Sequence, residues 1–119
     1  MAKAQVSEVF NEVKDALNDP NAVRWTNAKL YRYLLEAERM IASNHPETQY
    51  DGKVENVAPA LLTATTDYTT IHSDHAPALV HYMCFRAFTE DSDSAGNQKL
   101  SQYHFQLYKN ALEDVSVGR

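Results

Sequence analysis

Three side chains of the kind that bind metal ions lie within four residues of one another, at His72, Asp74 and His75, and His81 follows nearby. A zinc site needs three or four such ligands in a fixed geometry. The His-x-x-His spacing has neither a cysteine partner nor a second spaced pair. We therefore expect no metal site here, and we interpret Asp74 as a helix cap among surface histidines.

Two other groups of residues also lack what chemistry would require. Glu90, Asp91 and Asp93 resemble part of a calcium loop, but the sixth-position glycine and the closing glutamate are missing. Cys84 is the only cysteine and lies on an apolar helix face, which predicts a buried core residue. The sequence has no phosphate-binding loop or nucleophile elbow. We predict no catalytic residue and no cofactor, so the chain is not expected to be an enzyme.

The length and net charge of the chain indicate what kind of protein it is. The 119 residues suit a single domain, and the net charge of −5 argues against sequence-independent binding of nucleic acid. The longest apolar runs fall far short of the roughly 20 residues that span a bilayer, and the start of the chain lacks a signal-peptide core. These features predict a soluble chain that is not exported and does not bind a membrane.

The element that must organise the rest is a helix beginning near Ala76, because Pro77 suits the first turn of a helix. Apolar residues cover about half of its circumference, and Tyr82 and Phe85 extend onto the other side. Such a helix must be covered on more than one side. We therefore predict that it is the central helix of the fold, covered by its own chain or by a neighbour.

Two helices should precede the central one. The first has apolar residues at helical spacing and ends at residues 18–21, which include Pro20. These apolar residues are Val6, Val9, Phe10, Val13, Ala16 and Leu17. The second begins after the N-cap Thr26, with Trp25 and Leu30 as a hydrophobic staple, and ends near Asn44. Its predicted core stripe is Leu30, Tyr33, Leu34, Ala37 and Ile41.

The segment from about residue 44 to 73 has no helical period and is rich in threonine, which favours extended structure. A loop of this length in a small domain is commonly functional. We predict an all-α fold, a small four-helix bundle with a long extended or β-hairpin-like arm between the second and third helices. One domain then covers residues 1–119, with the arm at about 44–73 and a tail at about 114–119.

The last helix, from about residue 96 or 97 to 115, has two apolar stripes about 100° apart. The predicted core stripe is Leu100, Tyr103, His104, Leu107, Ala111 and Val115. The second stripe is Phe105, Tyr108 and Leu112, with Ser101. A small monomer is not expected to bury two apolar faces of a terminal helix. Together with Tyr82 and Phe85, this second stripe predicts self-association or a dedicated partner.

The order of these parts resembles the small head-to-tail connector (adaptor) proteins of tailed bacteriophages. The resemblance covers nearly the whole chain. It is most specific at V-R-W-T (residues 23–26) and at P-A-L-V-H-Y-M-C-F-R-A-F-T-E-D-S-D-S-A-G-N (residues 77–97), and Y-H-F-Q-L-Y follows in the last helix. It implies a structural virion protein that forms a ring, usually of twelve copies, below the portal protein. The ring would continue the DNA channel and offer the tail or stopper protein a docking surface.

The resemblance also implies roles for particular residues. The subunit interface would use the extra apolar side chains Tyr82, Phe85, Phe105, Tyr108 and Leu112 in a heterologous contact. The portal would be contacted by the C-terminal residues Asp114, Val115, Ser116, Val117, Gly118 and Arg119. Genomic DNA would pass through without specific binding, since an acidic wall repels phosphate. The protein would occupy the head-tail neck of the virion, and the host cytoplasm during assembly.

Two alternative functions remain open from the sequence. A stopper or tail-completion protein of the same particle is one, and only an adaptor should bind the portal ring directly. A small helical regulatory or DNA-associated module is the other, although the net charge argues against it.

Overall fold

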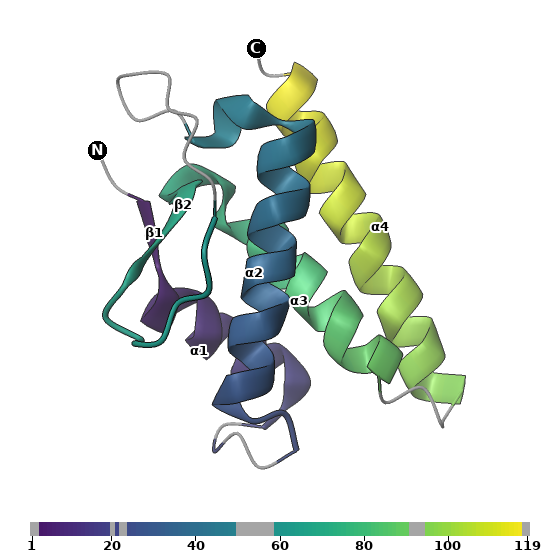
Figure 1. Ribbon diagram of the computed structural model, residues 1–119. Helices are drawn as coiled ribbons and strands as arrows, with labels where there is room; N and C mark the ends of the chain where they lie inside the picture. Colours follow the sequence, from purple (N-terminus) through teal and green to yellow (C-terminus); the bar gives the residue numbers. More distant parts are fainter. Residues whose placement is uncertain (1–2, 20, 22–23, 50–58, 91–94, 118–119) are drawn as a thin grey trace.

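Four α-helices and two short β-strands make up most of the computed structural model, which describes residues 3–19, 21, 24–49, 59–90 and 95–117 (Figure 1). In chain order they are β1 (Lys3–Gln5), α1 (Val6–Leu17), α2 (Asn27–Asn44), β2 (Tyr68–His72), α3 (Ala76–Glu90) and α4 (Ala95–Val117). Short 3-10 helices lie at Pro46–Gln49 and Ser73–His75. The predicted all-α fold, with an extended segment between the second and third helices, is confirmed.

Helix α1 ends where the sequence predicts. It stops at Asn18, which has a left-handed backbone (φ 55°) and donates its N–H to the carbonyl of Asp15 at 3.1 Å. Asparagine tolerates this conformation better than most residues. The apolar stripe of α1 is buried except for Ala16, which is exposed.

Helix α2 is capped by Thr26, whose side-chain oxygen accepts the Lys29 N–H at 3.4 Å. Its predicted core stripe is buried throughout, and so are both members of the predicted staple, Trp25 and Leu30. The Trp25 indole N–H donates to the Ala87 carbonyl at 3.1 Å, which ties the start of α2 to α3. The cap and the staple together fix where α2 enters the core.

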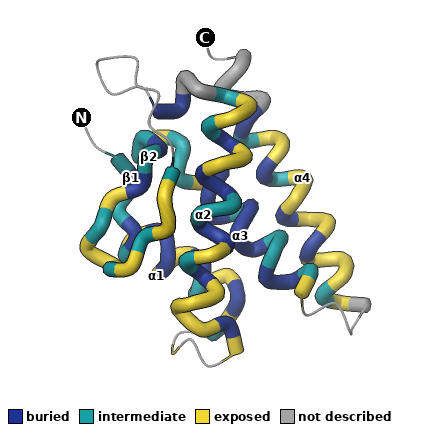
Figure 2. Tube along the Cα trace, in the orientation of Figure 1, coloured by how far each residue is buried: buried dark blue, intermediate teal, exposed yellow. Residues whose placement is uncertain are grey.

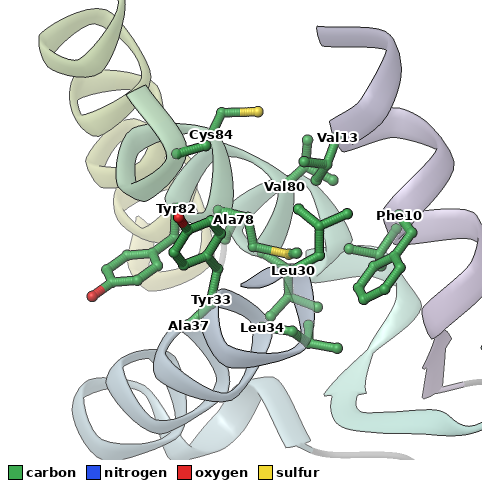
Figure 3. Packing of buried hydrophobic residues seen from close by; sticks show 14 of the residues in the cluster. Phe10, Val13, Leu30, Tyr33, Leu34, Ala37, Ala78, Val80, Tyr82 and Cys84 are labelled. Atoms are coloured by element: carbon green, nitrogen blue, oxygen red, sulfur yellow. The ribbon is translucent and has the colours of Figure 1, made fainter. Parts of the chain in front are cut away.

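Helix α3 is the central helix, since it packs against α1, α2 and α4. Figure 3 shows its side chains, among them Ala78 and Val80, facing Phe10 and Val13 of α1 and Leu34 of α2. Tyr82, which the sequence places outside the main apolar face, is buried as well. A single chain therefore covers α3 on three sides.

The extended segment contains β2, which pairs antiparallel with β1 at the start of the chain. Lys3 lies opposite His72 and Gln5 opposite Tyr68, with an irregularity between the two pairs. We call residues 59–72 the strap, because they lie along the body, and Ile71 is fully buried. The pairing of β2 with β1 was not predicted, and residues 50–58 of the predicted arm lie outside the described residues.

Candidate functional site

The residues predicted to form a subunit interface come together between α3 and α4, a contact that we call the α3–α4 seam. The Tyr82 ring lies 5.1 Å from that of Tyr108, and the Phe85 ring lies 4.8 Å from that of Phe105, measured between ring centroids. Tyr82, Tyr108 and Leu112 are buried within their own chain. Phe85 is half-buried, and Phe105 is 37% exposed.

Hydroxyl groups join the two helices near their connection. The Thr89 hydroxyl donates to the Phe85 carbonyl at 2.7 Å and lies 2.6 Å from the Ser101 hydroxyl oxygen. Ser101 also reaches the Phe85 carbonyl at 3.3 Å. These bonds explain why a polar residue, Ser101, can be buried on the face of α4 that packs on α3.

Two histidines meet at the centre of the seam, and sequence reasoning did not pair them. The Nδ1 atoms of His81 and His104 lie 3.3 Å apart, and the His104 ring stacks on Phe88. Burial lowers the pKa of both imidazoles, while Glu12 of α1 acts to raise that of His81 and the nearby His81 lowers that of His104 further. His81 is half-buried and His104 is buried, and only the packing of α4 on α3 brings them into contact.

The predicted core stripe of α4 is wrong at two positions. Leu100 is 41% exposed and Tyr103 is 58% exposed, while Leu107 and Ala111 are half-buried. His104 is buried as predicted, and it shares the buried face of α4 with Ser101, Tyr108 and Leu112 of the second stripe. Two apolar stripes about 100° apart have similar periodicity, so the spacing alone does not decide which of them meets α3. Figure 2 shows the resulting exposed side of α4.

We use the name exposed stripe for the exposed Leu100 and Tyr103 of α4 together with the half-buried Leu107 and Ala111. At its N-terminal end it borders a cleft of about 560 Å³. The cleft is lined by Ala16, Leu17, Asn18, Asp19, Arg24, Trp25, Phe88, Asn97 and Leu100. Asp19 accepts the backbone N–H groups of Arg24 and Trp25, each at 3.0 Å, which shapes this edge. Leu100 belongs to both the stripe and the cleft, whose lining mixes apolar side chains with polar and charged ones.

The side chains considered as metal ligands, His72, Asp74 and His75, lie just before the start of α3. His72 Nδ1 accepts the Asp74 backbone N–H at 3.1 Å, and the His72 and His75 rings are 6.3 Å apart. Among the residues that the structure describes, no three His, Cys, Asp or Glu side chains gather as a metal ion would require. Cys84 is buried as predicted, and burial raises its pKa to about 12. Such a thiol is a core residue rather than a nucleophile.

The other predicted residues are placed as follows. Glu90 accepts a hydrogen bond from the Tyr33 hydroxyl group, and Asp91 and Asp93 lie outside the described residues. The backbone of Asp114, Val115, Ser116 and Val117 is in the last turns of α4, but their side chains, and all of Gly118 and Arg119, lie outside the description. No helix among the described residues has the length and apolar character needed to cross a membrane.

A small helical body that exposes large apolar side chains, Leu100 and Tyr103, on its last helix is typical of proteins that assemble with others. The family of SU10 adaptor proteins matches residues 46–119, which is more than half of the chain and includes the strap, α3 and α4. The chain belongs to this family and is a phage adaptor, a structural component of the virion that contacts other virion proteins. Comparisons with curated proteins and with solved structures found no match.

Proposed function

We propose that this adaptor forms a ring between the portal and the tail, continues the DNA channel, and provides the surface on which the tail docks. The observation that supports this most is the exposed stripe of α4, since Leu100 and Tyr103 lie on a helix whose opposite face is occupied by α3. Large exposed apolar side chains in a row are typical of protein interfaces. In a ring, each subunit presents this stripe to a different surface of its neighbour.

The five residues that the sequence assigns to the interface divide into two roles in this proposal. Phe85 and Phe105 lie at the exposed edge of the seam and would contact the neighbour. Tyr82, Tyr108 and Leu112 are buried beneath them and hold α4 in position. We therefore expect Tyr82, Tyr108 and Leu112 to affect assembly indirectly, by fixing the position of α4.

The remaining contacts of the ring follow from charge and from the chain end. A net charge of −5 per subunit makes an acidic ring, which would repel phosphate and let DNA pass without adhering. The last turns of α4 include Asp114–Val117, and we propose that residues 114–119 contact the portal. A ring of twelve copies is our expectation for the assembled state.

The test is the mass of the purified protein, alone and mixed with rings of the portal protein of its own phage, by native mass spectrometry. An adaptor should add to the portal in a fixed ring stoichiometry. A Tyr103→Asp variant should keep its helical circular dichroism but lose ring formation, because it places a charge on the exposed stripe. A chain ending at Glu113 should lose portal binding.

The matched control is Tyr68→Asp, because Tyr68 of β2 is as exposed as Tyr103, at 59%, and lies away from α4. This variant should still join the ring. Equal assembly by both variants would show that the α4 stripe is not the subunit contact. A protein that ignores the portal and forms a stable dimer would contradict the adaptor ring as a whole.

A further inference from the structure

A carboxyl group buried in α2 holds the strap in place. Glu38 is 1% exposed, and its Oε1 atom accepts the backbone N–H of Thr70 at 2.8 Å and the Thr70 hydroxyl group at 3.2 Å. Thr70 is at the centre of β2. The side chain of Glu38 thus takes the place of a third strand by accepting a backbone N–H of β2.

The second oxygen of the same carboxyl group has no partner. Glu38 Oε2 is buried and forms no hydrogen bond. An ionised carboxylate in this position would bring a charge into the core without a cation to balance it, which is costly. Burial accordingly raises the pKa of Glu38, although the two hydrogen bonds from Thr70 act in the opposite direction.

The charged groups described below do not offset the cost of ionising Glu38 in this buried position. Lys3 of β1 donates from its Nζ atom to the Gln49 carbonyl at 2.5 Å. His72 is at the end of β2, and the side chain of Glu47, in the 3-10 helix after α2, lies outside the description. Neither Lys3 nor His72 contributes to the pKa shift of Glu38, whose causes are burial and the bonds from Thr70.

We propose that Glu38 is a proton-dependent clamp, which holds β2 against α2 as a neutral acid and loosens the strap when it loses its proton. Ionisation is favoured only if water reaches Oε2, and this requires the edge of β2 to move away from α2. The strap is then the part of the fold that opens locally while the helices remain packed. This regulation goes beyond ring assembly and does not depend on it.

The sign of the pH dependence follows from the direction of the shift. A carboxyl group that is harder to ionise in the closed state stabilises that state fully at low pH, and this stabilisation is lost as the pH rises through the raised pKa. One proton is released on opening. The opening equilibrium should therefore increase up to about tenfold per pH unit between the ordinary pKa and the raised one.

The experiment is hydrogen exchange of the Thr70 amide in the full chain, measured by NMR and expressed as a protection factor so that intrinsic exchange is removed. The protection factor should fall by up to about tenfold per pH unit above the ordinary pKa of 4.5 and then level off. The Leu30 amide, which donates to the Thr26 carbonyl at 3.0 Å in the same helix, is the internal control and should not change.

A Glu38→Gln variant provides the matched test, since its amide oxygen can accept the same two bonds and has no proton to lose. Protection of Thr70 in this variant should be independent of pH. A pH-independent Thr70 in the natural chain, or an unchanged slope in the variant, would overturn the proposal. If the variant does not fold, the ionisation of Glu38 in the natural chain can be followed by the carbon-13 chemical shift of its Cδ atom. Ionisation near pH 4.5 while the Thr70 amide is still protected would also overturn the proposal.

Discussion

Helix α4 packs on α3 at the seam, while the strap pairs with β1 and bonds to α2 through Glu38. Each of these two contacts contains ionisable groups that are buried or half-buried. At the α3–α4 seam these are His81 and His104, whose nitrogen atoms lie 3.3 Å apart. At the strap the group is Glu38. Each contact also buries one oxygen without a partner, the Tyr108 hydroxyl in the seam and Glu38 Oε2 beneath the strap.

The two contacts differ in which protonation state burial disfavours. A histidine is charged when protonated, so burial lowers its pKa, while a carboxyl group is charged when deprotonated, so burial raises its pKa. For the same physical cause, we expect acid to weaken the seam and base to weaken the strap. The two attachments of this small domain should therefore respond to pH in opposite directions.

The largest effect is expected from removing the aromatic side chain at the centre of the seam. Tyr108→Ala deletes a buried ring that contacts Tyr82 and Phe105, and it should lower the free energy of unfolding by about 3–5 kcal/mol. Urea denaturation followed by circular dichroism measures this change. Tyr103→Ala, on the exposed stripe, should change stability by no more than about 0.5 kcal/mol. Similar losses in both variants would mean that α4 is not held by the seam.

Acidification should weaken the seam while it tightens the strap. Because burial lowers the pKa of His81 and His104 below the ordinary value of 6.5, their contribution to stability is present above that pH and is lost as the pH falls through the lowered values. Protonating both imidazoles would also place two positive charges side by side. Amide exchange at Tyr108, corrected for intrinsic rates, should therefore speed up below pH 6.5.

A variant that cannot be doubly protonated isolates this effect from the other carboxylates that titrate in acid. His104→Phe keeps an aromatic ring against Phe88 and removes one titrating group from the pair. Its seam should lose less protection on acidification than the natural seam does. An equal loss would assign the acid sensitivity to other groups.

Sequence periodicity predicted the parts of the fold that have one dominant apolar face. Helices α1 and α2 have a single stripe each, with a proline or a Thr26 cap marking an end, and both were predicted nearly residue for residue. Helix α4 has two stripes of similar apolar character, and the predicted core stripe combined the exposed Leu100 and Tyr103 with the buried His104. Only the position of α3 beside α4 decides between them.

The contacts that distinguish the two attachments could not be predicted in the same way. His81 and His104 are 23 residues apart, and Glu38 and Thr70 are 32 apart, so no local pattern links them. In the sequence, nothing distinguishes Glu38 from the other charged residues of α2. Buried polar groups that bond across the fold depend on tertiary packing, which periodicity does not encode.

The smallest effect expected is a gain in stability, and it compares two tyrosine hydroxyl groups. The Tyr108 hydroxyl is buried without a partner, and burial raises its pKa to about 12, while the Tyr33 hydroxyl donates to the Glu90 carboxylate. Tyr108→Phe removes an unsatisfied polar group and should raise the free energy of unfolding by about 1 kcal/mol, whereas Tyr33→Phe should lower it by about 1 kcal/mol. The same urea titration measures both. A loss of stability in Tyr108→Phe would mean that this hydroxyl has a hydrogen-bond partner in solution. The seam would then differ from the strap, because Glu38 Oε2 would be the one buried oxygen without a hydrogen bond among the described residues.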